Sequence, residues 1–147
     1  MKDFPDHYEK LEELIWKFFQ DMPMPEGTAH TRMPFDQFMK NHNRFEEKLY
    51  GIEIVAVDGE KYIGSTDIYV MPKSDPYKAW TGSLGVLREY RRQGIATALK
   101  VKAFEKLREK GIKQVRTDNE ENNPMYLINV ALGFKPEPYC FEYQKEI

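Results

Sequence analysis

The stretch that decides the fold is GVLREYRRQGIATAL, residues 85–99. An apolar, β-forming run gives way to a short charged turn at residues 89–93, Gly94 follows, and a helix-forming tract begins at Ile95. The first N–H groups of a helix have no partner within the helix and carry partial positive charge. A glycine beside them lets a phosphate oxygen approach the backbone closely. The pattern therefore predicts a strand, a phosphate-binding turn and a helix.

This turn differs from two common phosphate-binding patterns. No Gly-Lys-Ser/Thr sequence closes it, as in a P-loop, and it has only one glycine of the dinucleotide fingerprint. Arg91 and Arg92 add positive charge beside Gly94. A strand-to-helix turn that simply carries surface arginines would have the same sequence. The two interpretations have to be separated by the rest of the chain.

Length and composition indicate one globular domain over residues 1–147, long enough to bury a substantial core. No apolar run approaches the ~20 residues of a membrane span, and the acidic N-terminus is unlike a signal peptide. The single cysteine, Cys140, cannot form an internal disulfide and fits a reducing compartment. We therefore expect a cytoplasmic protein that contacts no membrane and holds no metal.

Charge is distributed unevenly along the chain. Residues 88–116 contain ten Lys/Arg and three Asp/Glu, whereas the remainder is strongly acidic and the net charge is −2. A basic segment inside an acidic protein points to a local anionic ligand. Nucleic acid would be repelled by the acidic remainder, and residues 88–116 contain only Tyr90 and Phe104 as aromatic residues that could stack on bases. A compact polyphosphate ligand fits better, so we expect no nucleic-acid partner.

Hydrophobic periodicity and turn residues predict alternating helices and strands. Asp58-Gly59 between two alternating runs is a strong hairpin signal. The helix after the turn should bury the stripe Ile95, Ala98, Leu99, Ala103 and Leu107, and Gly111 ends it. The expected helices cover residues 6–20, 34–42, 94–110 and 122–132, and the expected strands cover residues 50–57, 61–71, 78–87, 112–117 and 138–147.

Asparagines mark a second candidate segment near the C-terminus. Asn122 and Asn129 fall on one helical stripe, together with residues 125, 132 and 133. An amide on a buried-looking stripe needs hydrogen-bond partners, so we expect these two to contact a ligand. For Asn119 and Asn123 we expect bonds to the local backbone instead.

The two segments together resemble the GNAT N-acetyltransferase superfamily. Arg91-x-x-Gly94-x-Ala96 matches its pyrophosphate loop, and an asparagine followed about ten residues later by Leu132-Gly133-Phe134 matches its second cofactor motif. The resemblance implies an α/β (α+β) fold with a mixed, mostly antiparallel central sheet, splayed at the cofactor strand, and helices on both faces. The family usually opens with a strand, whereas this sequence opens with a helix. Either that strand is missing, or these residues belong to a longer parent with tandem domains.

Family resemblance implies transfer of an acetyl group from acetyl-CoA to a primary amine by direct attack in a ternary complex. The pyrophosphate would bind the backbone N–H groups of residues 92–97. The pantetheine arm would pair with the exposed backbone of the third strand, where an N–H near Val86 could also stabilise the oxyanion. The implied cofactor-binding residues are Val86, Leu87, Arg91, Arg92, Gln93, Gly94, Ile95, Ala96, Thr97, Asn122 and Asn129.

Several residues are candidates for proton transfer. Many family members have a tyrosine acid where this chain has Asn129, and Tyr126 lies three residues earlier on a similar side of the helix. The attacking amine needs a base, for which Glu53 and Asp67 are candidates, although a water chain or a plain surface role for both carboxylates stays open. Cys140 has no histidine near it in sequence, and the family needs no covalent step.

A different class of function also stays open. With Asn129 in place of the usual tyrosine, the chain could be a non-catalytic GNAT-like module that binds acyl-CoA. The acidic remainder hints at a cationic amine acceptor, without naming it. Pairing into a homodimer is common in the family and is left open here.

Overall fold

The computed structural model describes residues 6–22, 29–48, 51–71, 75–119 and 123–137. The chain divides into two compact units, Met1–Thr117 and Asp118–Ile147, which are considered separately below. The prediction of a single domain stays a prediction. The first unit contains α1 (His7–Phe19), α2 (Phe35–Lys48), β1 (Ile52–Asp58), β2 (Lys61–Met71), β3 (Asp75–Val86), the 3₁₀ turn η1 (Arg88–Tyr90), α3 (Ile95–Glu109) and β4 (Gln114–Arg116), and the second contains α4 (Pro124–Ala131).

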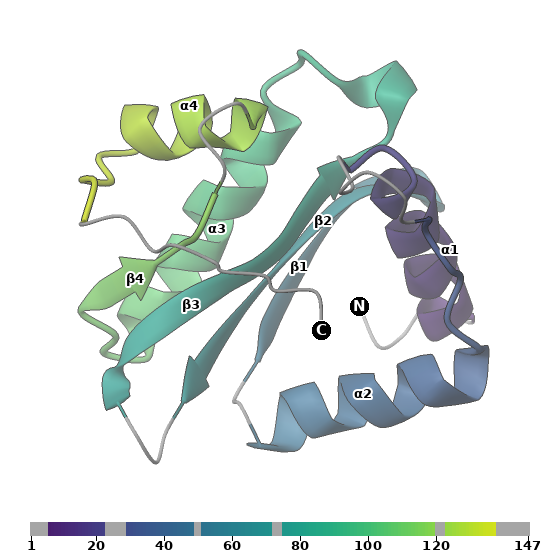
Figure 1. Ribbon diagram of the computed structural model, residues 1–147, viewed down its shortest axis with the longest axis horizontal. Helices are drawn as coiled ribbons and strands as arrows, with labels where there is room; N and C mark the ends of the chain where they lie inside the picture. The colour runs from purple at the N-terminus through teal and green to yellow at the C-terminus, as the bar shows by residue number, and fades with distance from the viewer. Residues whose placement is uncertain (1–5, 23–28, 49–50, 72–74, 120–122, 138–147) are drawn as a thin grey trace, which may run out of the picture. The chain divides into compact units, whose positions relative to one another are not determined.

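The sheet of the first unit has the order β1-β2-β3-β4 (Figure 1). Strand β1 pairs with β2, and β2 with β3, in antiparallel fashion. Strand β4 returns through α3 and lies parallel to β3, with Lys78 opposite Gln114 and Trp80 opposite Arg116. The predicted mixed, mostly antiparallel sheet is confirmed, and so is the Asp58-Gly59 hairpin, in which Gly59 has a φ of 57°.

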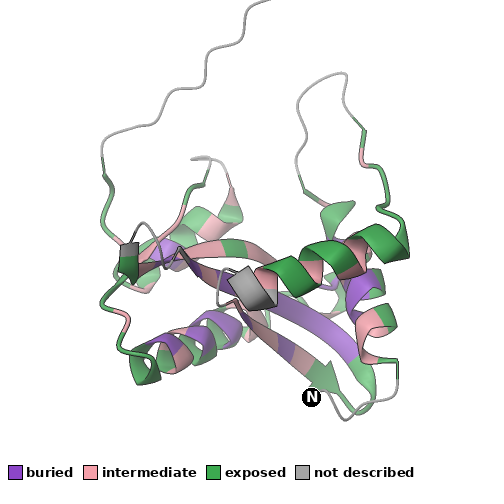
Figure 2. Cartoon of the chain, turned by 90° about the horizontal axis from the view of Figure 1, so that it is seen from below, coloured by how far each residue is buried: buried purple, intermediate pink, exposed green. Residues whose placement is uncertain are grey.

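Helices cover both faces of this sheet, as predicted, with a separate apolar cluster on each face (Figure 1). Leu11, Leu14 and Phe18 of α1 pack with Val55, Tyr62 and Leu87. Ala103 and Leu107 of α3 pack with Ile52, Ile68, Val70 and Ala79. Tyr62 and Ile68 face opposite sides because the β1–β2 register shifts between Ala56 and Val57. Buried residues gather along the central strand β2 (Figure 2).

Strand β3 leaves its parallel partner before it reaches the turn. Its pairing with β4 covers only Lys78 to Trp80, and the hydroxyl of Thr81 donates to that of Thr117 at 2.7 Å. A bulge follows, since Gly82 and Ser83 both lie opposite the single residue Asp67 of β2. Beyond it, no described residue of the first unit pairs with the β4-side edge of β3. The splay expected at the cofactor strand stays a prediction, because β4 itself ends at Arg116.

Helix α2 is longer than predicted and begins one residue later, running to Lys48 instead of ending near His42. The aromatic residues of this extension make tertiary contacts. The polar sequence of residues 41–44 gives no indication of them. The ring of Phe45 meets that of Tyr69 at 6.4 Å, and His42 lies 5.2 Å from the ring of Tyr8. At the other end of the chain, α4 is shorter than predicted, and the predicted strand 138–147 with Cys140 lies outside the described residues.

The buried stripe of α3 differs from the prediction at two positions. Leu99, Ala103 and Leu107 are buried as expected, but Ile95 is only half-buried and Ala98 is exposed, whereas Lys100 is buried. Burial lowers the pKa of Lys100 to about 8. Among the described residues, no helix is both long enough and apolar enough to cross a membrane.

Candidate functional site: the phosphate turn and the carboxylates of the sheet

The turn between β3 and α3 has a backbone that depends on glycine. Gly94 occupies the N-cap of α3 with a φ of 79°, in the left-handed region, and Arg92 also has a positive φ of 63°. A Cβ added to Gly94 would meet no atom within 4 Å, so the space in front of the helix end is open. Side chains other than glycine rarely adopt this backbone. The glycine therefore both shapes the turn and keeps it accessible.

The amino-terminal end of α3 offers hydrogen-bond donors that no described residue uses. No described side chain caps the helix, and its first intrahelical bond runs from the N–H of Ala98 to the carbonyl of Gly94 at 3.0 Å. The N–H groups of Ile95, Ala96 and Thr97 therefore lack a partner inside the helix. Together with the helix dipole, they make an anion-binding surface.

The two arginines of the turn have different surroundings. Arg91 donates from Nε to the carbonyl of Val86 at 2.9 Å and from Nη2 to the carboxylate of Asp21 at 2.5 Å. Arg92 is exposed, and its guanidinium has no hydrogen-bonding or ionic partner among the described residues. Arg91 thus fastens the turn to the rest of the fold, whereas Arg92 is available to an incoming anion. Gln93, also exposed, makes only a long contact of 3.5 Å with the carbonyl of Glu89.

The backbone groups of Leu87 and Val86, at the end of β3, have different surroundings. Leu87 donates its N–H to Ile63 at 2.9 Å and accepts from Tyr90 at 2.9 Å, so its backbone is already engaged. The Leu87–Ile63 bond makes Gly64 and Val86 a non-hydrogen-bonded pair. The N–H of Val86 therefore points away from β2, toward the edge that β4 leaves uncovered.

Two acidic side chains face each other on the sheet. Glu53 of β1 and Asp67 of β2 are direct cross-strand partners, so their side chains lie on the same face. His42 of α2 lies above them, with Nδ1 3.8 Å from a carboxylate oxygen of Glu53. Both predicted base candidates are therefore brought together beneath α2.

Asp67 is also bound to the bulge in β3. Its Oδ1 accepts from the N–H of Ser83 at 2.7 Å and from the Ser83 hydroxyl. Its carboxylate occupies the space above Gly82, where an added Cβ would lie 1.8 Å from Oδ2. Burial raises the pKa of Asp67 above its usual range, and the bonds from Ser83 oppose that shift only in part.

In the second unit, Asn129 of α4 is buried and Tyr126 is partly exposed. The side-chain N–H of Asn129 donates to Asn119 at 2.5 Å, while its Oδ1 has no partner among the described residues. Asn123 caps α4 by accepting from the N–H of Met125 at 3.0 Å, as expected, and Oδ1 of Asn119 accepts from the side chain of Asn129. Asn122 lies outside the described residues.

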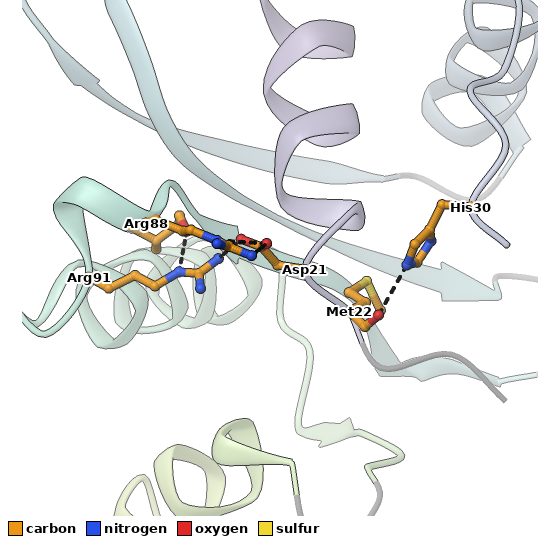
Figure 3. Close-up of polar contacts among 6 residues, drawn as sticks. Asp21, Met22, His30, Arg88 and Arg91 are labelled. Carbon is orange, nitrogen blue, oxygen red and sulfur yellow. Dashed lines mark hydrogen bonds and ion pairs between the residues drawn. The ribbon is translucent and has the colours of Figure 1, made fainter. Parts of the chain in front are cut away.

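Sequence reasoning missed residues that shape the turn from a distance. Asp21, just past the end of α1, binds both Arg88 and Arg91 (Figure 3). Ser83, at the bulge, binds Asp67. These contacts join residues 16 to 70 positions apart, and no local pattern in the sequence signals them.

Comparison with solved structures finds the same fold in acetyltransferases. The aminoglycoside acetyltransferase AAC(6')-Iy, in complex with the bisubstrate analogue CoA-S-monomethyl-acetylneamine, is 18% identical with a TM-score of 0.70, covering 96% of this chain and 92% of that one. The aminoglycoside acetyltransferase meta-AAC0020 from an uncultured soil metagenomic sample, in complex with sisomicin, is 20% identical with a TM-score of 0.69, covering 97% and 91%. A transcriptional regulator from Bacillus halodurans C-125 is 18% identical with a TM-score of 0.73, covering 93% and 94%.

At these identities the structural similarities show the fold alone. No curated protein matches the sequence. The model of the acetyltransferase (GNAT) family, however, matches residues 8–134, which span the phosphate turn, the sheet and α4. The chain therefore belongs to the acetyltransferase (GNAT) family.

Proposed function

We propose that this protein is an acetyl-CoA-dependent N-acetyltransferase that acts on a cationic primary amine. The observation that carries the proposal is the uncapped end of α3 behind Gly94, with its open approach and its unused N–H donors. A diphosphate is the kind of ligand that such a helix end binds. Family membership and the CoA-containing complexes of structural neighbours support this choice of cosubstrate.

The residues present fit CoA. The backbone N–H groups of residues 93–97 would hold the diphosphate, and Arg92 would add a charged contact that no described residue competes for. The N–H of Val86, on the uncovered edge of β3, would donate to an amide carbonyl of the pantetheine arm or to the acyl oxygen. When bound, acetyl-CoA supplies the acyl group and its thiol leaving group.

The carboxylates beneath α2 suit a cationic acceptor. An alkylammonium has a pKa of about 10.4 in water and must lose a proton before it can attack. The raised pKa of Asp67 makes its carboxylate a stronger base than a surface aspartate. We propose Asp67 as the proton acceptor, directly or through a water molecule, with Glu53 as the second negative charge that attracts the ammonium group.

The family resemblance implies that Tyr126 and Asn129 act on the leaving thiolate. A phenol can give a proton to a leaving thiolate, and an amide can only donate a hydrogen bond. We therefore propose Tyr126 as the acid. The buried Oδ1 of Asn129, which has no partner among the described residues, would accept from an N–H of the cosubstrate. We further propose a cytoplasmic location, because the single cysteine fits a reducing compartment. The oligomeric state is a matter for measurement.

The test is acceptor-dependent release of the free CoA thiol from acetyl-CoA. The panel should contain aminoglycosides, polyamines, amino acids and peptides, with hydrolysis in the absence of acceptor subtracted. Release with one amine class would establish the activity and the acceptor class together. CoA binding without release on any acceptor would favour the non-catalytic acyl-CoA module, and absence of CoA binding would refute the proposal.

A further inference from the structure

The end of α1 is tied to the phosphate turn by one carboxylate. Oδ1 of Asp21 accepts from Nε of Arg88 at 2.8 Å and also from its Nη2, while Oδ2 accepts from Nη2 of Arg91 at 2.5 Å (Figure 3). The Asp21 side chain is only 14% exposed, although that of Arg88 is 75% exposed. A single acidic group thus bridges two guanidinium groups that flank η1.

Arg91 connects the segment after α1 both to β3 and to the turn. Its Nε also donates to the carbonyl of Val86, the last residue of β3, at 2.9 Å. The same side chain therefore touches the end of α1, the end of β3 and the turn to which it belongs. Each guanidinium keeps further N–H donors beyond those used in these bonds.

Charge explains why a bridging carboxylate is needed here. Arg88, Arg91 and Arg92 lie within five residues beside the positive end of the α3 dipole, so they repel one another. Asp21 offsets part of that charge by binding Arg88 and Arg91. The hydrogen bond from Arg88, more than that from Arg91, lowers the pKa of Asp21, so this carboxylate stays ionised at neutral pH.

We propose that Asp21 is a positioning residue for cosubstrate binding: it holds Arg88 and Arg91 beside the phosphate turn, where their remaining donors reach the phosphate groups of CoA. This inference rests on the proposed function. It gives a residue just past the end of α1 a part in binding CoA through the two arginines that it holds.

The opposite role is also physically sensible and gives the opposite result. If Asp21 only competed with phosphate for the arginines, its removal would raise the affinity for CoA. If Asp21 positions the arginines, its removal lets the guanidinium groups of Arg88 and Arg91 move apart. The affinity for CoA then falls, even though the turn becomes more positive. Charge and positioning therefore predict changes of different sign.

The experiment measures CoA binding by calorimetry at fixed salt for the wild type, Asp21→Asn and Glu89→Gln. Glu89 lies in η1 between the two arginines, but its carboxylate pairs with Lys61 at 2.9 Å, so Glu89→Gln removes the same charge from the same turn without touching the bridge. We expect Asp21→Asn to weaken CoA binding about tenfold, as loss of charge-assisted hydrogen bonds would do. We expect Glu89→Gln to bind CoA as well as the wild type or slightly more tightly.

A double-mutant cycle separates positioning from a general loss of stability. In an Arg88→Gln/Arg91→Gln background, Asp21→Asn should leave CoA affinity unchanged, because the groups through which it acts are gone. Partial recovery of affinity in Asp21→Glu is expected, since the carboxylate is restored at a slightly longer reach. Melting temperatures of every variant show that the compared proteins are folded.

The outcomes also separate this inference from the proposed function. A wild-type protein that does not bind CoA overturns the proposed function, and the role of Asp21 with it. A wild type that binds CoA while Asp21→Asn binds equally well or more tightly overturns the positioning role alone. So does a tenfold loss from Asp21→Asn that persists in the double-arginine background.

Discussion

The backbone N–H of Ser83 donates to Oδ1 of Asp67 at 2.7 Å, and this bond connects β2 to the bulge in β3. The same carboxylate faces Glu53 across the strand pair. Asp67 therefore connects the bulge in β3 to the pair of carboxylates beneath α2 that we propose to bind the acceptor amine. A substitution that keeps its shape and removes its charge can separate these two roles.

Asp67→Asn should lower kcat about a hundredfold or more while the protein stays folded. The amide oxygen can still accept from Ser83, but it cannot take a proton from the amine. Steady-state kinetics with the acceptor found by thiol release would measure the effect. Glu60→Gln, an exposed carboxyl in the β1–β2 turn, is the control. An Asp67→Asn enzyme with unchanged kcat would leave the carboxylate a purely structural role.

The pH dependence of stability should also change in Asp67→Asn. Because burial raises the pKa of Asp67 in the folded state, the folded protein binds more protons than the unfolded chain just above pH ~4. This contribution to stability is fully present below the unfolded pKa and is lost as the pH rises through the folded pKa. Urea unfolding from about pH 4 to 7 should therefore show a smaller loss of stability in Asp67→Asn than in the wild type.

Gly94→Glu should abolish CoA binding. The new carboxylate would fill the open space before α3 and repel the diphosphate, and the φ of 79° would strain the backbone. Gly111→Glu is a matched control at the other end of α3, since Gly111 has a φ of 76° and equally open surroundings. Similar melting temperatures with CoA binding lost only in Gly94→Glu would support the site. Micromolar affinity in Gly94→Glu would show that the turn is misassigned.

Turns and helix ends that depend on local backbone conformation were predictable from local sequence patterns. Gly59 in the hairpin and the glycines at the two ends of α3 have positive φ, which few other residues adopt. Glycine at these positions is visible in the sequence itself. The order of strand, turn and helix at residues 85–99 was therefore predictable, and the family motif with it.

Features that depend on tertiary contacts could not be predicted from the sequence. Helix α2 continues to Lys48 because Phe45 packs on β2, near Tyr69, not because its polar residues favour a helix. Lys100 is buried and Ala98 is exposed, which the apolar periodicity of α3 does not suggest. Asp21 is separated in sequence from Arg88 by 67 positions and from Arg91 by 70, so these ion pairs form only when α1 lies beside the turn.

Tyr126→Phe should reduce kcat and leave the KM for acetyl-CoA nearly unchanged, because only the acidic proton is lost. The side chain is 36% exposed on α4, so the substitution should cost little stability. Tyr77→Phe, on β3 and 62% exposed, controls for removal of a phenol elsewhere. Equal turnover in Tyr126→Phe and the wild type would remove Tyr126 as the acid and leave solvent, or another group, to protonate the thiolate.

Gly85→Ala should destabilise the fold by about 2 kcal/mol or more through overpacking. An added Cβ at Gly85 would lie 2.1 Å from Cγ of Phe18, whose ring is only 3% exposed and is packed in the α1 cluster. Gly59→Ala should cost less, since its surroundings are open and only its φ of 57° is strained. Chemical denaturation measures both. If the clash with Phe18 is the cause, Phe18→Leu should recover part of the loss in a Gly85→Ala background, whereas simple addition of the two effects would place the strain elsewhere.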